Sequence, residues 1–121
     1  MHKPRPVYLD LTGIRQPLSA VVSFLHRISG ALLFVLLPCV LYVFELSLAD
    51  EASFARMAQQ PLLRFALGGV ALFYGYHLLA GVRFLIFDLH RPGLYRYAQV
   101  SARLVLLGAV LVGMAVVSAL W

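Results

Sequence analysis

The chain has 121 residues, of which 62% are hydrophobic and 12% are charged. Soluble domains average about 45–50% apolar and about 25% charged residues, so a soluble fold of this length could not bury so much apolar surface. The net charge of +5 does not indicate a nucleic-acid partner, because the basic residues lie at the borders of apolar runs rather than in one patch. The single cysteine, Cys39, excludes a disulfide framework and is expected to be a small buried hydrophobe.

Three apolar runs follow one another along the chain, over residues 28–46, 62–87 and 104–121. Each approaches or exceeds the roughly 20 residues that a helix needs to cross a bilayer. The period-2 alternation of a membrane barrel is absent, so helices must satisfy the backbone groups in lipid. The sequence therefore predicts an all-α integral membrane protein, a single domain over residues 1–121 with three transmembrane helices at about 20–48, 62–88 and 102–121. Pro38 is expected to kink the first helix.

The basic residues predict the orientation of these helices. Eight of the ten fall on one side, before or at the start of the first run or around the second connection: Lys3, Arg5, Arg15, Arg27, Arg83, Arg91, Arg96 and Arg103. The first connection carries Asp50 and Glu51, with Arg56 and Arg64 close by. The positive-inside rule then places the N-terminus in the cytoplasm and the C-terminus in the periplasm, across a bacterial inner membrane.

One polar segment lies where the first helix enters the membrane. Ser23, His26 and Arg27 are at positions i, i+3 and i+4, so they share one helix face. A hydroxyl, an imidazole and a guanidinium are suited to binding an anionic or carbonyl-bearing ligand at the cytoplasmic interface. The spacing alone leaves an alternative open, in which an arginine snorkels to the surface beside a serine at a helix start.

A second polar segment lies on the middle helix, where one stripe carries His77, Gly81, Phe84 and Asp88. In an upright helix, His77 lies about 9 Å deeper than Arg83. An ionisable residue at such depth is a candidate functional residue, and Gly81 leaves space for a flat ring. The pattern is typical of a haem ligand. The alternative is a neutral histidine bonded to a neighbouring helix.

Depth limits how many haem ligands the chain is expected to supply. His26 is expected at the interface and His77 about two turns deeper, while His2 and His90 lie outside the apolar runs. Two axial ligands of one haem lie at nearly the same depth on opposite faces of the ring. The chain is therefore expected to supply one intramembrane ligand and, if the iron is six-coordinate, a partner chain the other.

Taken together and in order, the motifs resemble one protein family. The chain reads Arg5-Pro6-Val7-Tyr8-Leu9-Asp10-Leu11, then Ile14-Arg15-Gln16-Pro17, then Ser23-x-x-His26-Arg27-x-Ser29-Gly30, and later His77-x-x-x-Gly81-x-Arg83-x-x-x-x-Asp88. With the three-helix topology, these motifs resemble the cytochrome b membrane-anchor subunit of succinate dehydrogenase.

The resemblance implies a set of ligands and residue roles. It implies a haem b whose iron is ligated by His77, with the second ligand supplied by a second small membrane-anchor subunit. It also implies that Ser23 and Arg27 face the ubiquinone pocket, and that His26, with Arg27 beside it, lies near the haem propionates. Phe84 departs from the family, because relatives often have a histidine there, so a polar contact with the haem from that position is lost.

The function that the resemblance implies is an anchor and electron-transport subunit of the tricarboxylic acid cycle. Electrons from succinate leave a flavoprotein subunit, pass through an iron–sulfur subunit and reduce ubiquinone at the cytoplasmic border. No catalytic residues are expected in this chain, and the active enzyme is the complex. Two alternatives are a structural anchor without haem or quinone, against which the deep His77 argues, and the corresponding subunit of a fumarate reductase.

Overall fold

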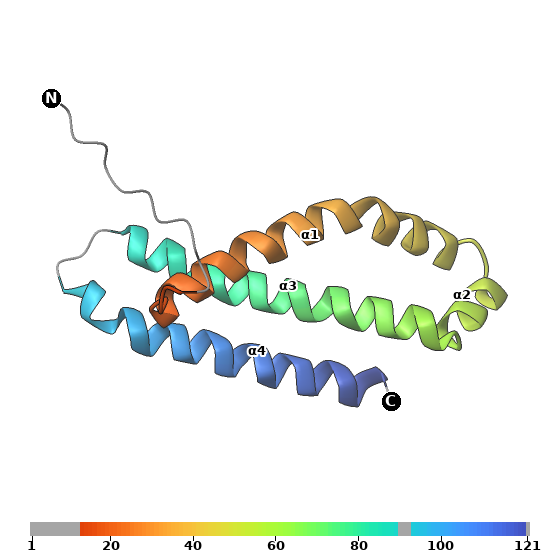
Figure 1. Ribbon diagram of the computed structural model, residues 1–121. Helices are drawn as coiled ribbons and strands as arrows, with labels where there is room; N and C mark the ends of the chain where they lie inside the picture. The colour runs from red at the N-terminus through yellow and green to blue at the C-terminus, as the bar shows by residue number, and fades with distance from the viewer. Residues whose placement is uncertain (1–12, 90–92, 121) are drawn as a thin grey trace, which may run out of the picture.

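The computed structural model describes residues 13–89 and 93–120. In chain order its elements are α1 (Leu18–Ser47), α2 (Glu51–Ala58), α3 (Pro61–Asp88), the 3-10 helix η1 (Leu94–Tyr97) and α4 (Ala98–Leu120). Helices α3 and α4 lie side by side along their length, and α1 crosses them (Figure 1). The segment 5–11 of the family motif lies outside the described residues, as do His2, His90, Lys3 and Arg91.

Three helical stretches of the described ranges are long and apolar enough to cross a membrane: α1, α3 and the stretch Leu94–Leu120 that includes α4. Many of their large apolar side chains are exposed, as with Phe34 at 78% and Leu62 at 81%. Lipid is the surrounding in which such exposure is stable, since water would not tolerate so large an apolar surface. The predicted all-α membrane fold with three spans is confirmed.

The observed helix bounds differ from the prediction mainly in α4 and α2. Helix α4 begins at Ala98 instead of near residue 102, because the polar turn before the apolar run is already helical. The short helix α2 was not predicted. Asp50 caps it, accepting from the Ser53 N–H at 2.7 Å and from the Ser53 hydroxyl at 2.8 Å. The side-chain hydrogen bond from Ser53 holds the pKa of Asp50 below its ordinary value.

Helix α1 bends along its course in Figure 1 and contains Pro38, as the sequence predicts. Cys39, beside it, is exposed on the outer surface of the bundle. The prediction of a buried cysteine is therefore wrong, because α1 packs against the other helices on part of its surface and leaves many of its apolar side chains exposed.

Glycines bring α3 and α4 into close contact. A Cβ atom on Gly75 would lie 2.6 Å from the Val112 side chain, and one on Gly113 would lie 2.8 Å from Leu72. The buried core lies where all three long helices meet, and consists of Val22, Tyr76, Ala80, Ala102 and Val105. The Tyr76 hydroxyl donates to the Val22 carbonyl at 2.9 Å, which ties α3 to the first turns of α1.

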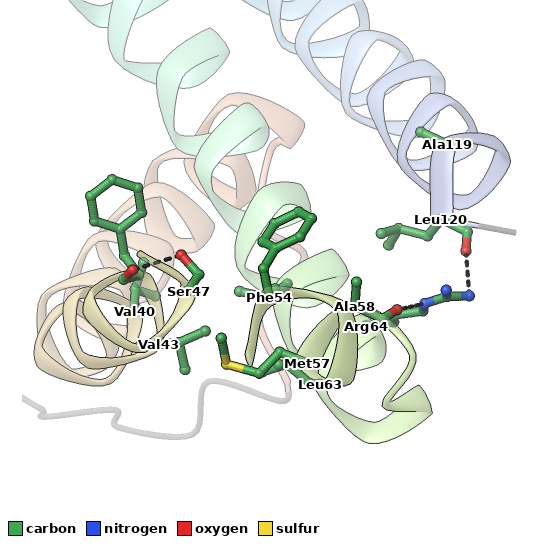
Figure 2. A pocket seen from close by; sticks show the side chains of 12 residues that line it. Val40, Val43, Ser47, Phe54, Met57, Ala58, Leu63, Arg64, Ala119 and Leu120 are labelled. Carbon is green, nitrogen blue, oxygen red and sulfur yellow. Dashed lines mark hydrogen bonds between the residues drawn. The ribbon is translucent and has the colours of Figure 1, made fainter. Parts of the chain in front are cut away.

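At the end of the bundle that holds α2, an apolar cavity of about 460 Å³ opens between α1, α2, α3 and the end of α4. Among the described residues that line it, Arg64 is the charged one. Figure 2 shows the guanidinium of Arg64 bonded to two carbonyl oxygens, those of Ala58 and Leu120. Both acceptors lie at the C-terminal ends of helices, where a cation interacts favourably with the helix dipole.

Candidate functional site

The two histidines of the sequence motifs meet where α1 crosses α3. The rings of His26 and His77 are stacked, with centroids 4.1 Å apart and planes 8° from parallel. The expectation that His77 lies about two turns deeper is therefore wrong. Helix α1 begins at Leu18, so His26 is already about 12 Å along α1. His77 is about 16 Å from the end of α3 at Asp88, which brings the rings to a similar level.

Ser29 lies beneath the stacked rings and contacts both histidine residues. It is 1% exposed, and its hydroxyl donates to the His26 carbonyl at 2.9 Å. The same Oγ lies 3.1 Å from Nδ1 of His77, which is also 3.1 Å from the His26 carbonyl oxygen. These contacts engage Nδ1 of His77 and leave Nε2 for a ligand.

Two glycines make room for the histidine rings. A Cβ atom on Gly30 would lie 2.8 Å from Cε1 of His77, so the ring could not keep its position. A Cβ atom on Gly81 would lie 3.4 Å from Nε2 of His26. The space that the sequence predicts beside Gly81 is thus occupied by the ring of His26. The motif includes Gly30, but sequence reasoning missed its role, since nothing in the spacing relates it to a ring on another helix.

A groove of about 570 Å³ opens beside His26, lined also by Gly81, Phe84, Leu85, Phe87, Asp88 and Tyr95. Nε2 of His26 is buried without a hydrogen-bond partner among the described residues. A buried polar atom left unpaired costs about 1–3 kcal/mol. Because the same residue lines the groove, His26 is a candidate for contact with a bound group. The Phe84 ring covers His26, with centroids 5.2 Å apart.

Arg83 is 7% exposed and packs against residues that line this groove. Its Nε donates to the Ser101 hydroxyl at 3.0 Å, and its Nη2 donates to the Ala98 carbonyl at 3.1 Å. The guanidinium also lies 5.0 Å from the ring centroids of Phe84 and Phe87, two residues that line the groove. Sequence reasoning treated Arg83 only as a charge at the membrane border and missed these contacts.

The other residues of the first motif lie beside His26 on α1. Ser23 is half-buried and Arg27 is exposed, one turn apart on the helix. Of these three residues, it is His26 that lines the groove. The roles of Ser23 and Arg27 toward a quinone stay predictions.

The stacking of the rings bears on how many haem ligands the chain can offer. Two axial ligands point ring nitrogens at one iron from opposite sides, whereas His26 and His77 turn the faces of their rings toward each other. In this arrangement they cannot hold one iron between them. The depth argument for a single ligand therefore does not hold, and a single haem ligand from this chain stays a prediction.

Comparison with known proteins decides the family. Residues 1–118 match the family model described as succinate dehydrogenase/fumarate reductase transmembrane subunit. The chain belongs to this family. The succinate dehydrogenase cytochrome b556 subunit of Coxiella burnetii is 37% identical over 93 residues, which cover 74% of each chain. The cytochrome b556 subunit of Rickettsia conorii is 25% identical over 111 residues, covering 92% of this chain and 89% of the relative.

These similarities confirm the resemblance drawn from the motifs. The chain is a multi-pass transmembrane cytochrome b subunit of the succinate dehydrogenase and fumarate reductase family. Membership also means that the chain works with other subunits of such an enzyme. The match includes both the His26 and the His77 segments.

Proposed function

We propose that the chain binds haem b through His77 and anchors a succinate dehydrogenase that reduces ubiquinone. The observation that carries the proposal is the state of His77 within a membrane span. Its Nδ1 is held by Ser29 and the His26 carbonyl, and its Nε2 is left for a ligand. An imidazole held through one nitrogen and free at the other is the usual form of a histidine ligand. The name cytochrome b556 subunit, carried by the relatives, supports haem as the ligand.

The residues around His77 fit a haem. His77 would hold the iron through Nε2, and His26 would donate to a propionate in the tautomer that carries its proton on the unpaired Nε2. When bound, haem b would supply a one-electron redox centre inside the membrane. Because the two histidines of this chain are stacked, a second ligand would come from a second small membrane-anchor subunit.

Ser23 and Arg27 form the quinone side of the proposal. They lie one turn apart on α1, flanking His26 in the sequence, and Arg27 is exposed where a ligand can reach it. A hydroxyl and a guanidinium both donate, so together they can bind a quinone oxygen and stabilise the negative charge that develops on reduction. An iron–sulfur subunit and a flavoprotein subunit would supply the electrons from the cytoplasmic side of a bacterial inner membrane.

The family description also names fumarate reductase, in which electrons would run the other way. The named relatives favour succinate oxidation, since they are succinate dehydrogenase subunits. We therefore assign the oxidation of succinate as the direction in which the complex works.

One set of membranes tests both halves of the proposal, using the assembled complex with His77→Ala or Arg27→Ala. His77→Ala is expected to lose the haem band in a reduced-minus-oxidised spectrum, because the axial nitrogen is gone. Arg27→Ala is expected to keep the band but to reduce ubiquinone at least about tenfold more slowly, a change of about 1.4 kcal/mol. Oxidation of succinate by a soluble artificial acceptor should persist in Arg27→Ala, since that acceptor takes electrons upstream of the membrane.

Cys39→Ala is the control, because Cys39 is exposed on α1 and lies outside both sites. An unchanged haem band in assembled His77→Ala would contradict the haem assignment. Parallel loss of ubiquinone reduction and of artificial-acceptor activity in Arg27→Ala, with all subunits present, would contradict the quinone role and indicate a role in assembly.

A further inference from the structure

Ser29 is a fully buried polar side chain in a helix that otherwise turns mainly apolar residues to lipid. Burial of a hydroxyl is unfavourable unless it is hydrogen-bonded. A bond to the carbonyl three residues earlier, here that of His26 at 2.9 Å, is enough to satisfy the hydroxyl proton. The lone pairs of Oγ are then left over, and they face Nδ1 of His77 at 3.1 Å. Ser29 therefore acts as an acceptor toward His77.

The contacts of His77 fix where its proton lies. Nδ1 is 3.1 Å from the His26 carbonyl oxygen, an atom that can only accept. Without a proton, Nδ1 would face two lone pairs at hydrogen-bond distance, one from the carbonyl and one from Oγ. With a proton, it donates to both. A neutral imidazole carries a single N–H, so Nε2 bears the lone pair that a metal needs.

We propose that Ser29 is a positioning residue for His77, holding it in the tautomer with Nδ1 protonated and strengthening Nε2 as a ligand. The proposal rests on the proposed haem-binding function of His77. A hydrogen bond from the outer nitrogen of a ligating histidine fixes the ring and raises the basicity of the ligand. A more basic ligand favours the ferric iron over the ferrous iron, so Ser29 lowers the midpoint potential of the haem.

The site also indicates how large the effect of Ser29 is. The His26 carbonyl remains as a second acceptor when the serine is removed, so the tautomer is weakened rather than lost. Partners of this kind change metal affinity by about 10–100-fold, and the lower value applies where one acceptor is left. If the tenfold change falls on the ferric form alone, it raises the one-electron midpoint by about 59 mV.

The test compares Ser29→Ala and Ser29→Thr in the assembled complex. Ser29→Ala removes the acceptor and is expected to raise the haem midpoint potential, with a changed EPR signal of the ferric haem. Ser29→Thr keeps a hydroxyl that can bond the same carbonyl. Ser29 borders an apolar cavity of about 350 Å³, which gives the added methyl group space. Ser29→Thr is therefore expected to restore the potential and the EPR signal of the parent complex.

Ser118→Ala is the matched control, because Ser118 makes the same bond to a carbonyl three residues earlier, that of Ala115 at 2.9 Å, but lies on α4 away from the histidines. An unchanged potential in haem-loaded Ser29→Ala would overturn the proposal. So would a Ser29→Thr variant that shifts as far as Ser29→Ala or that also loses haem. Loss of haem in Ser29→Ala alone, with Ser29→Thr normal, would support it. A His77→Ala complex that keeps its haem would contradict the proposed binding of haem by His77. This result is distinct from an unchanged potential in Ser29→Ala, which contradicts only the positioning role of Ser29.

Discussion

The two ends of the helix bundle share one kind of contact between helices but differ in the residues around it. At each end an arginine of α3 holds one terminus of α4: Arg83 donates to the Ala98 carbonyl, and Arg64 to the Leu120 carbonyl. Arg64 borders an apolar cavity, whereas Arg83 lies beside the groove that contains His26. An arginine between helices is thus common to both ends. Among the described residues, the groove end differs in holding a buried side-chain nitrogen without a hydrogen-bond partner, Nε2 of His26.

The two arginines differ in their positions relative to the helix termini. Arg64 lies at the C-terminal end of α4 and in the first turn of α3, whereas Arg83 lies at the N-terminal end of α4 and nearer the C-terminal end of α3. The dipoles of the two antiparallel helices therefore act on each arginine in opposite senses. Arg83 is nevertheless the more buried of the two. It is held there by Ser101 and by the rings of Phe84 and Phe87. Because both rings line the groove, Arg83 supports the groove wall from behind.

The largest effect on haem content is expected from Gly30→Ala, which we compare with Gly69→Ala. Gly30→Ala places a methyl group 2.8 Å from Cε1 of His77, which must move the ring away from Ser29. We expect most of the haem to be lost. Gly69→Ala meets no atom within 4 Å and should keep its haem, with stability raised by up to about 1 kcal/mol, since alanine is the better helix former. Haem content per assembled complex and the thermal midpoint measure both. Normal haem content in Gly30→Ala would show that the histidine crossing is not the site.

An effect of intermediate size is expected from the two arginines. Arg83→Met removes two hydrogen bonds and two cation–ring contacts from a buried position. Hydrogen bonds to charged groups contribute about 1.5–3 kcal/mol each, so a loss of at least about 2 kcal/mol is expected. Arg64→Met removes bonds at a half-buried position and should cost about 1 kcal/mol.

Thermal midpoints of the two variant complexes in one detergent compare these costs directly. Haem content provides the second measurement, because Arg83→Met loosens Phe84 against His26 whereas Arg64→Met changes nothing near the groove. If Arg83→Met and Arg64→Met changed the thermal midpoint and the haem content equally, the two ends of the bundle would not differ in the way described.

The sequence was sufficient for the spans but not for the way they cross. Long apolar runs predict α1 and α3 to within a few residues, since lipid dictates their length. Helix α2 was missed because eight residues capped by Asp50 leave no hydrophobic pattern long enough to read. The motifs identified His26 and His77 as functional candidates. Their stacking was missed, because it depends on where α1 begins and on the crossing of two helices, and residue spacing encodes neither.

The same limit applies to the other contacts of the site. The bond between Arg83 and Ser101 joins residues 18 positions apart across a turn, and no periodicity connects them. Ser29 stands in the motif beside Gly30, yet only its burial and its distance to Nδ1 of His77 reveal what it does. Short-range pattern thus identified the residue types, whereas tertiary contacts assigned them their partners.

The smallest expected effect concerns which end of the bundle faces the cytoplasm, and it should leave haem and activity unchanged. Ala52, in α2, and Gln99, in the first turn of α4, are both exposed and lie at opposite ends of the bundle (Figure 1). Gly93 is a poorer position for a probe, since its φ of 89° strains any side chain. Ala52→Cys and Gln99→Cys, each with Cys39→Ala, are treated in spheroplasts with a membrane-impermeant thiol reagent. The excess of basic residues on the Gln99 side predicts labelling of Ala52→Cys only, and labelling of both variants once the membrane is opened. Labelling of Gln99→Cys alone in sealed spheroplasts would indicate that the end of the bundle with the histidines faces the periplasm. Electrons from a cytoplasmic iron–sulfur subunit could not then reach a quinone bound at Arg27, and the quinone assignment would be wrong together with the orientation.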